Sequence, residues 1–470
     1  MKSRKRTLSR RKFLGQASCA AVGSASLFST LFNLQMSSAL AQVAPGSPIF
    51  TDYKALVCLF LAGGADSNNM LIPYGLNEYN EYRGIRADLS LERETLLPLQ
   101  VGNGDGRTFA LHPGLGEIQQ QFNGGNVAFV NNVGTLVEPT TLANYEAGLA
   151  RVPEGLFSHS DQIQQWQTSI PDERSSVGWA GRMADILQAG NANESISMNL
   201  SLSGNNVMQT GNEVVSFSLQ PGMGAVGIED YGDHSWWARV QTPAINSLMD
   251  HQYLNLFEQT FASQVRSSID ASQRFQEAYS QAPTLQTAFS EDELSLSFET
   301  IARSIAVAGN LGMNRQTYFV LFGGWDHHDE VIEAQSEMLP VVSRALGSFQ
   351  SALGELGMEN QVTTFTASDF ARTLSSNGRG SDHAWGGSHL VMGGAVNGGR
   401  FYGTYPSLYA GNPLDTGRGR LIPTTSTDEY FAELALWFGV SPGDLLTIFP
   451  NLDRFYDPAG SGSPLGLFGV

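Results

Sequence analysis

Residues 361–389 read QVTTFTASDFARTLSSNGRGSDHAWGGSH and decide the fold class of the chain. The first part is rich in β-branched and aromatic residues, which favour a strand. An acid, Asp369, follows where that strand should end, and a polar loop then carries Asp382, His383 and His389. Acidic and imidazole side chains on loops after strands are typical of the sites of α/β proteins. We therefore expect an α/β fold with a functional site at this strand end.

Two other apolar runs end in the same way, in small residues followed by an acid. They are KALVCLFL at 54–61 and QTYFVLF at 316–322. The first leads to Asp66, and the second leads to Asp326 with His327 and His328 beside it. Uninterrupted hydrophobicity is typical of strands buried on both faces of a parallel sheet, and the carboxyl ends of such strands share one edge. We therefore expect Asp66, Asp326 and Asp369 to converge.

Three carboxylates at one point would repel one another and raise one another's pKa values. A divalent cation removes that cost, and mixed Asp and His ligation suits Zn²⁺ or Mn²⁺ better than Ca²⁺. One or two ions are compatible with the pattern, and two ions about 4 Å apart would suit phosphoryl or sulfuryl transfer. The alternative is structural, because a single acid after a strand is often a turn residue or a helix cap.

Strands and helices alternate at both ends of the chain, which predicts βαβ units with right-handed crossovers. The middle differs, because 195–230 favours short strands and 234–312 favours long helices. We therefore expect one domain over 42–470, with 190–312 as a probable insertion or cap over the sheet.

The first 41 residues have the pattern of a twin-arginine export signal. A basic region contains SRRKFL at 9–14, a weakly apolar stretch follows, and Ala39-Leu40-Ala41 resembles a cleavage site. An uncleaved anchor or a nucleic-acid-binding arm would explain these features less well, because all three parts occur in order. We expect transport by the twin-arginine translocase, cleavage near Ala41 and a periplasmic or secreted protein. No later apolar run reaches the roughly 18 residues that indicate a membrane span.

Charge and cysteine content exclude several functional classes. The first 41 residues hold seven of the 27 basic residues and no acid, so the formal charge changes from −18 to −25 without them. Such a surface is poorly suited to nucleic acid or anionic lipid. Cys19 leaves with the signal and Cys58 lies in an apolar run, which excludes an internal disulfide. A redox role is disfavoured, because Gly63-Gly64-Ala65 is not a dinucleotide-binding fingerprint.

A series of short motifs resembles the exported bacterial domain-of-unknown-function family numbered fifteen hundred and one. They are AGGADS at 62–67, SHSDQ at 158–162, GWAGR at 178–182, GGWDHH at 323–328, SDFART at 368–373, SDHAWG at 381–386 and GGRFYG at 398–403. The family is grouped with the alkaline phosphatase and sulfatase superfamily. This resemblance implies a doubly wound, mostly parallel sheet with a metal site at the strand ends. It implies no activity, because the family is uncharacterised.

The superfamily pattern, transferred to matching positions, implies a set of metal ligands. They are Asp66, Asp326, His328, Asp369 and His383. The chain departs from the pattern at Phe370, where a ligating histidine would be expected after Asp369. That departure removes one ligand of a complete two-metal site.

The same resemblance implies a nucleophile at a helix N-terminus after the second strand, where the helix dipole favours an anion. Ser158 fits that place, with Ser160 and Ser67 as alternatives. His159, between the two serines, is a further catalytic candidate whose residue type fits a structural role equally well.

Arg372 or Arg182 could hold the oxygens of a phosphate or sulfate group bidentately, as their residue type suggests. The leading hypothesis is a metal-dependent hydrolase of small phosphate or sulfate esters. The alternative is a non-catalytic protein of the same fold that binds a glycan or an envelope partner. Phe370 and the absence of a Thr or Cys nucleophile motif favour this alternative.

Overall fold

The computed structural model describes residues 50–103, 106–409 and 411–469, and the predicted signal segment with its cleavage site lies outside these ranges. A ten-stranded sheet has the order β12-β5-β11-β10-β1-β9-β6-β7-β8, with β13 paired to β5. Its strands are β1 Lys54–Leu61, β5 Val127–Gly134, β6 Asn199–Ser201, β7 Phe217–Gln220, β8 Gly224–Ala225, β9 Arg315–Phe322, β10 Val362–Ser368, β11 Gly387–Met392, β12 Arg400–Tyr402 and β13 Thr425–Ser426. A separate small sheet contains β2 Leu71–Pro73, β3 Leu97–Pro98 and β4 Phe109–Leu111.

The sheet is built around β1, which pairs in parallel with β10 on one side and β9 on the other. Every residue of β1 after Lys54 is buried, and β10 is buried throughout. Cys58 faces Phe365 and Phe319 across the two registers. These strands confirm the predicted α/β class with a mostly parallel sheet.

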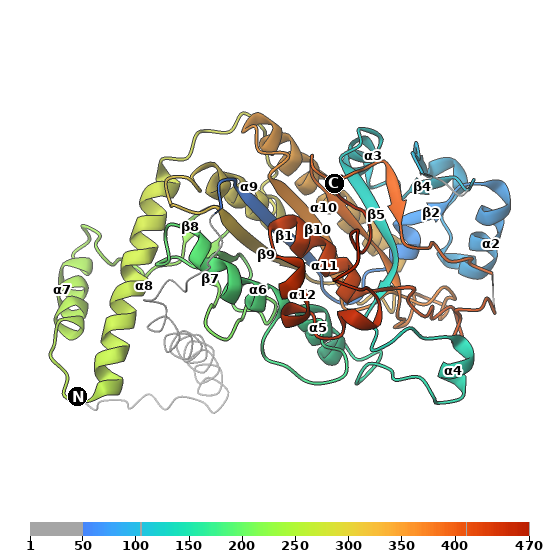
Figure 1. Ribbon diagram of the computed structural model, residues 1–470. Helices are drawn as coiled ribbons and strands as arrows, with labels where there is room; N and C mark the ends of the chain where they lie inside the picture. Colours follow the sequence, from blue (N-terminus) through green and yellow to red (C-terminus); the bar gives the residue numbers. More distant parts are fainter. Residues whose placement is uncertain (1–49, 104–105, 410, 470) are drawn as a thin grey trace, which may run out of the picture. The chain divides into compact units, whose positions relative to one another are not determined.

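Helices cover both faces of the sheet (Figure 1). One group contains α3 Gly116–Asn123, α9 Glu293–Ala306 and α10 Val331–Glu355, in which α10 packs against both of the others. The other contains α5 His159–Thr168, α6 Trp179–Leu187, α11 Thr427–Phe438 and α12 Leu445–Ile448. Two further helices are α2 Leu76–Arg86 and α4 Leu142–Glu146. Helix α11 has clear end signals, a Ser426–Glu429 capping box and Gly439 at φ +119°.

Several details differ from the sequence-based expectation. Strand β11 is antiparallel to both β10 and β5, and it begins at Gly387 so that His389 lies in a strand. Within the predicted 190–312 insertion, 199–225 supplies β6, β7 and β8 to the main sheet. These strands therefore extend the sheet and do not form a cap of their own.

Residues 227–273 form a separate compact unit. It contains α7 Ala238–Met249 and most of α8 Leu256–Ser280. Trp236, Leu254 and Phe257 are exposed in it. Among the helices of the described ranges, none combines the length and hydrophobicity that a membrane crossing requires.

Asp428 is a carboxyl group buried in the first turn of α11. Burial raises the pKa of Asp428 to about 8, although the nearby charge of Arg182 opposes the shift. The folded protein therefore keeps this proton up to a pH at which the unfolded chain has long released it.

We expect the free energy of unfolding to fall as the pH rises from about 4 to about 8, because the folded state binds the extra proton across that interval. Asp428→Asn removes this contribution, so the stability of the variant relative to that of the wild type should be higher at pH 8 than at pH 5. Urea denaturation at both pH values measures the difference. Equal pH slopes for the two proteins would contradict the assignment.

Candidate metal centre

The loops after β1, β9 and β10 meet at one point, and a glycine permits their close approach. Gly63 has φ +120°, and a Cβ built on it would lie 2.5 Å from the backbone nitrogen of Asp326. The Gly63 N–H donates to Asp369 Oδ1 at 3.0 Å. The parallel strands therefore bring Asp326 and Asp369 to one edge, as the sequence predicts.

Two histidines at this edge are oriented by carboxylates through their Nδ1 atoms. His159, the first residue of α5, contacts Asp369 Oδ2 at 2.6 Å. His328 contacts Asp382 Oδ1 at 3.1 Å. An ionised carboxylate only accepts hydrogen bonds, so each Nδ1 donates and each neutral ring has its lone pair on Nε2.

A third histidine, His383, is oriented by a main-chain carbonyl. Its Nδ1 donates to the carbonyl oxygen of Phe157 at 2.8 Å. Phe157 has φ +72°, a left-handed conformation that is uncommon for a bulky residue, and its N–H donates to Gln162 Oε1 at 2.9 Å. The chain therefore turns sharply just before Ser158, and this turn directs the carbonyl toward His383.

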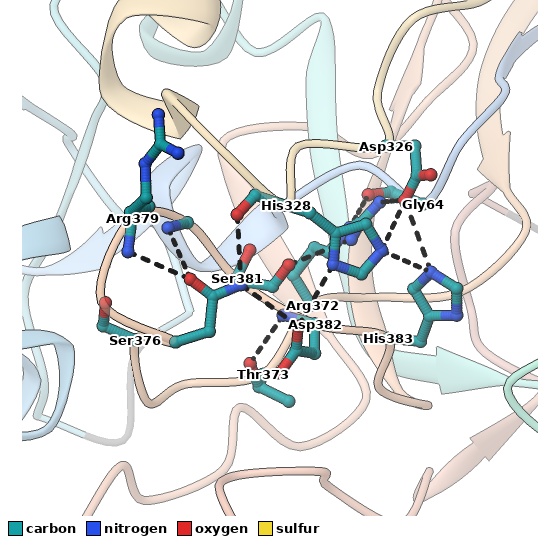
Figure 2. Close-up of polar contacts among 12 residues, drawn as sticks. Gly64, Asp326, His328, Arg372, Thr373, Ser376, Arg379, Ser381, Asp382 and His383 are labelled. Atoms are coloured by element: carbon teal, nitrogen blue, oxygen red, sulfur yellow. Dashed lines mark hydrogen bonds and ion pairs between the residues drawn. The ribbon is translucent and has the colours of Figure 1, made fainter.

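The three Nε2 atoms converge on Asp326 Oδ1. The separations are 3.4 Å from His159, 3.1 Å from His328 and 3.3 Å from His383. The Nε2 atoms of His328 and His383 are 3.0 Å apart (Figure 2). His159, Asp326 and His383 also form a group whose potential ligand atoms all lie within 4.8 Å of one another.

This donor set fits a metal ion. Zinc bonds of about 2.0–2.1 Å in a tetrahedral site separate neighbouring ligand atoms by roughly 3.3 Å. The separations of 3.1–3.4 Å from the imidazoles to Asp326 are close to that value, although the group of mutually close ligand atoms contains His159, Asp326 and His383 and not His328. His159 Nε2 is buried and has no hydrogen-bond partner among the described residues. A cation would accept this lone pair. It would also lie between the Nε2 atoms and Asp326 Oδ1, which otherwise face one another as hydrogen-bond acceptors.

The carboxylates of the centre are held ionised. Burial opposes the ionisation of Asp326, but the hydrogen bond and charge of Arg372 outweigh it and bring its pKa to about 2. The pKa of Asp382 is also about 2, because hydrogen bonds led by Asn377 outweigh its burial. Burial lowers the pKa of His383 below its ordinary value, which favours the neutral ring that a metal requires.

The structure corrects the role expected for Arg372 as a clamp on substrate oxygens. Its side chain is fully buried, and its guanidinium donates within the protein. The acceptors are the carbonyl oxygens of Gly63, Gly64, Trp325 and Ser381 and the carboxylate of Asp326. Arg372 therefore joins the strand-end loops and balances the charge of Asp326.

The structure also places Asp66 in another role than the expected metal ligand. Its Oδ2 atom pairs with the Arg86 guanidinium at 2.5 Å, and both side chains are fully buried. Its Oδ1 atom accepts from the Asn68 N–H at 3.2 Å. Arg86 therefore supplies the positive charge that we expected from an ion.

Asp369 lies behind His159, because one carboxylate oxygen contacts that ring and the other accepts from the Gly63 N–H. It therefore orients a ligand, which differs from the expected direct ligation. Phe370 packs between two imidazoles, with ring centres 4.7 Å from His159 and 4.5 Å from His383. The residue that departs from the expected superfamily pattern thus forms an apolar wall of the centre.

The other residues that the sequence singled out have contacts of their own. Ser158 precedes α5, and its Oγ atom is 3.1 Å from Ser160 Oγ. Ser67 is buried near His389, and burial lowers the pKa of His389 to about 3. Arg182 donates to three main-chain carbonyl groups, which indicates a structural role.

The sequence reasoning missed three contributors to the centre. Asp382 was noticed only as a loop acid, and Arg418 was not noticed although its Nη1 atom lies 2.5 Å from Asp382 Oδ2. The third is the Phe157 carbonyl. The repeated Gly-Arg-Gly-Arg at 417–420 was the available signal for Arg418.

The roles of Asp66 as a structural ion-pair partner and as a metal ligand can be separated. Arg86→Met should destabilise the protein by about 3–5 kcal/mol, because it leaves the buried Asp66 carboxylate without a counter-charge. Adding Asp66→Asn should recover part of that loss, measured by urea denaturation. The double variant should also keep the metal content of the wild type, measured by elemental analysis. A folded double variant without metal would show that Asp66 is a ligand after all.

Comparisons with known proteins concern the family and the fold of the chain. No curated protein matches the chain. Among solved structures, a PsFucS1 sulfatase from Pseudoalteromonas sp. is 12% identical, with a TM-score of 0.33 over 89% of this chain and 71% of that one. The lipoteichoic acid synthase LtaP from Listeria monocytogenes is 8% identical, with a TM-score of 0.33 over 86% and 78% of the two chains.

A third match is Ps i-CgsB in complex with k-i-k-neocarrahexaose, at 10% identity and a TM-score of 0.34 over 87% and 78% of the chains. At these identities and scores, the activity has to be argued from the site itself. A sequence profile of a family described as protein of unknown function (DUF1501) matches residues 53–416, which is most of the chain. The chain therefore belongs to the DUF1501 family.

Proposed function

We propose that the protein is a metal-dependent hydrolase of phosphate or sulfate esters. The ligands are the Nε2 atoms of His159, His328 and His383 and the Oδ1 atom of Asp326. The convergence of these four atoms, with imidazole-to-carboxylate separations of 3.1–3.4 Å, is the observation that carries the proposal. Imidazole and carboxylate donors favour Zn²⁺, with Mn²⁺ as the alternative. One ion suits the donor set, because Asp369 and Asp382 are turned toward Nδ1 atoms.

The charge of the centre supports an anionic substrate. The side chains bonded into the network include three carboxylates, those of Asp326, Asp369 and Asp382, and two guanidiniums, those of Arg372 and Arg418. Their sum is −1, and a divalent ion changes it to +1. When bound, such an ion supplies charge neutralisation for the oxygens of an ester and acidifies a nearby hydroxyl group.

The protein's own residues would divide the remaining work. Arg372 keeps Asp326 ionised and holds the loop after β9 against the loop after β1. Phe370 covers one side of His159 and His383, which excludes water there and strengthens the local electrostatics. Asp326 is about half exposed, so the centre is open to a substrate from solvent.

We assign the nucleophile to Ser158, whose Oγ would bond to phosphorus or sulfur as the alcohol leaves, before water releases the free anion. Ser158 is the neighbour of the ligand His159, at the N-terminus of a ten-residue helix. Its side chain makes no capping hydrogen bond, and its Oγ atom is 3.1 Å from Ser160 Oγ.

The export signal belongs to the same proposal. A twin-arginine substrate folds before transport, so the ion would be loaded in the cytoplasm, and the leader would be cleaved near Ala41. The mature protein would then act on small anionic esters or a glycan in the periplasm or outside the cell. Nucleic acid and a stable membrane span have no part in this function.

Metal content and turnover test the proposal directly. Protein folded in a bacterial host should hold one Zn²⁺ or Mn²⁺ per chain and hydrolyse at least one aryl phosphate or aryl sulfate. His383→Ala should lose both properties, because it removes one of four donors. His251→Ala is the matched control, since His251 is an exposed histidine that contacts Tyr253.

Ser158→Ala distinguishes the enzyme from the binding alternative. The variant should keep its metal and lose turnover if Ser158 is the nucleophile. Among the described residues, the Ser158 hydroxyl contacts another hydroxyl, that of Ser160, and not a basic group that would activate it. This contact supports the alternative, a protein that binds a glycan or an envelope partner. Metal-loaded wild type with no turnover of any phosphate or sulfate ester would favour that alternative.

A further inference from the structure

The loop at 415–420, Asp-Thr-Gly-Arg-Gly-Arg, has an unusual backbone. Gly417, Arg418 and Gly419 have φ values of +113°, +64° and +74°, so an arginine adopts the left-handed region between two glycines. Asp415 holds this turn, because its Oδ1 atom accepts from the N–H groups of Gly417 and Gly419 at 2.8 and 2.7 Å. An unfavourable backbone conformation that is so well supported calls for a functional explanation.

The loop is docked on the chain that follows Arg372. The Leu374 N–H donates to the Gly419 carbonyl at 3.3 Å, and the Ser375 N–H donates to the Arg418 carbonyl at 3.2 Å. A Cβ on Gly419 would lie 2.3 Å from Leu374 Cβ, so only glycine allows this approach. The position of Arg418 is therefore set from both sides.

Arg418 reaches the candidate metal centre through one carboxylate. Its Nη1 atom contacts Asp382 Oδ2 at 2.5 Å, and Asp382 Oδ1 contacts His328 Nδ1 at 3.1 Å. Asn377 also donates to Asp382 Oδ1, at 3.1 Å. The two oxygens of Asp382 thus have different partners, a guanidinium on one and an imidazole on the other.

We propose that Arg418 is a positioning residue for the metal centre. By holding Oδ2, it turns Oδ1 of Asp382 toward His328 Nδ1, and this contact directs His328 Nε2 toward the ion. The inference rests on the proposed function, because it concerns a ligand of the proposed ion. In this proposal Arg418 orients a metal ligand and does not bind the substrate.

An exposed arginine and aspartate more often form a surface ion pair of little consequence. Two observations argue against that reading here. The Asp382 side chain is only 26% exposed, whereas that of Arg418 is 42% exposed. The same loop also supports a second ligand, because Arg420 Nε donates to the His383 carbonyl at 3.0 Å and its guanidinium lies 5.4 Å from the Phe157 ring centre.

The affinity of the full-length protein for Zn²⁺, measured by competition with a chelator, tests the proposal. Arg418→Gln should weaken Zn²⁺ binding about tenfold or more, as loss of groups that orient metal ligands does elsewhere. Arg418→Lys should recover part of the loss, because it keeps the charge. Arg379→Gln is the matched control, since Arg379 is an exposed arginine whose ion pair, with Asp329 at 3.3 Å, does not include a histidine. Its affinity should stay within about twofold of the wild type.

A double-mutant cycle shows whether Arg418 acts through Asp382. In an Asp382→Asn background, Arg418→Gln should cause no further loss of Zn²⁺ affinity. An equal loss in both backgrounds, or wild-type affinity in folded Arg418→Gln, would overturn the positioning role while leaving the metal centre in place. A wild-type protein that binds neither Zn²⁺ nor Mn²⁺ would refute the proposed function, and the positioning role with it.

Discussion

The buried guanidinium of Arg372 is the contact on which the candidate site depends. It bonds to carbonyl oxygens in the loops after β1 and β9, and to one in its own loop. An arginine stays charged at any physiological pH, so it acts as a permanent cation with fixed directions. The Asp326 carboxylate is its anionic partner, and this pairing keeps one potential ligand ionised before any ion arrives.

Two arginines reduce the repulsion between carboxylates that the sequence suggested metal ions would reduce. Parallel strands do bring acids toward one edge, and like charges there would be costly. Arg86 neutralises Asp66 and Arg372 balances Asp326, so these two carboxylates have counter-charges within the protein. The imidazoles are then arranged by groups behind them, which are two carboxylates and one carbonyl.

The sequence was sufficient for the class of fold and for part of the site. Strand β1 was predicted at 54–61 and lies at Lys54–Leu61, because an uninterrupted apolar run leaves few alternatives. Asp326 and His383 were expected from their places after strands, whereas the choice of His328 over His327 came from the superfamily resemblance. The pairing of Asp66 with Arg86 could not be read from a single sequence, because it depends on how α2 packs. The ring orientation of His383 depends likewise on the left-handed turn at Phe157, which no propensity predicts.

The single cysteine of the central strand has a further consequence. Cys58 is fully buried, and burial raises the pKa of its thiol well above the ordinary value. A thiolate forms there only when β1 separates from its neighbours, so a thiol reagent can react only with opened molecules. In a chain without the first 41 residues, labelling of the Cys58 thiol would therefore measure the opening of the sheet. Its rate of labelling would report how often the central strand β1 becomes accessible to solvent.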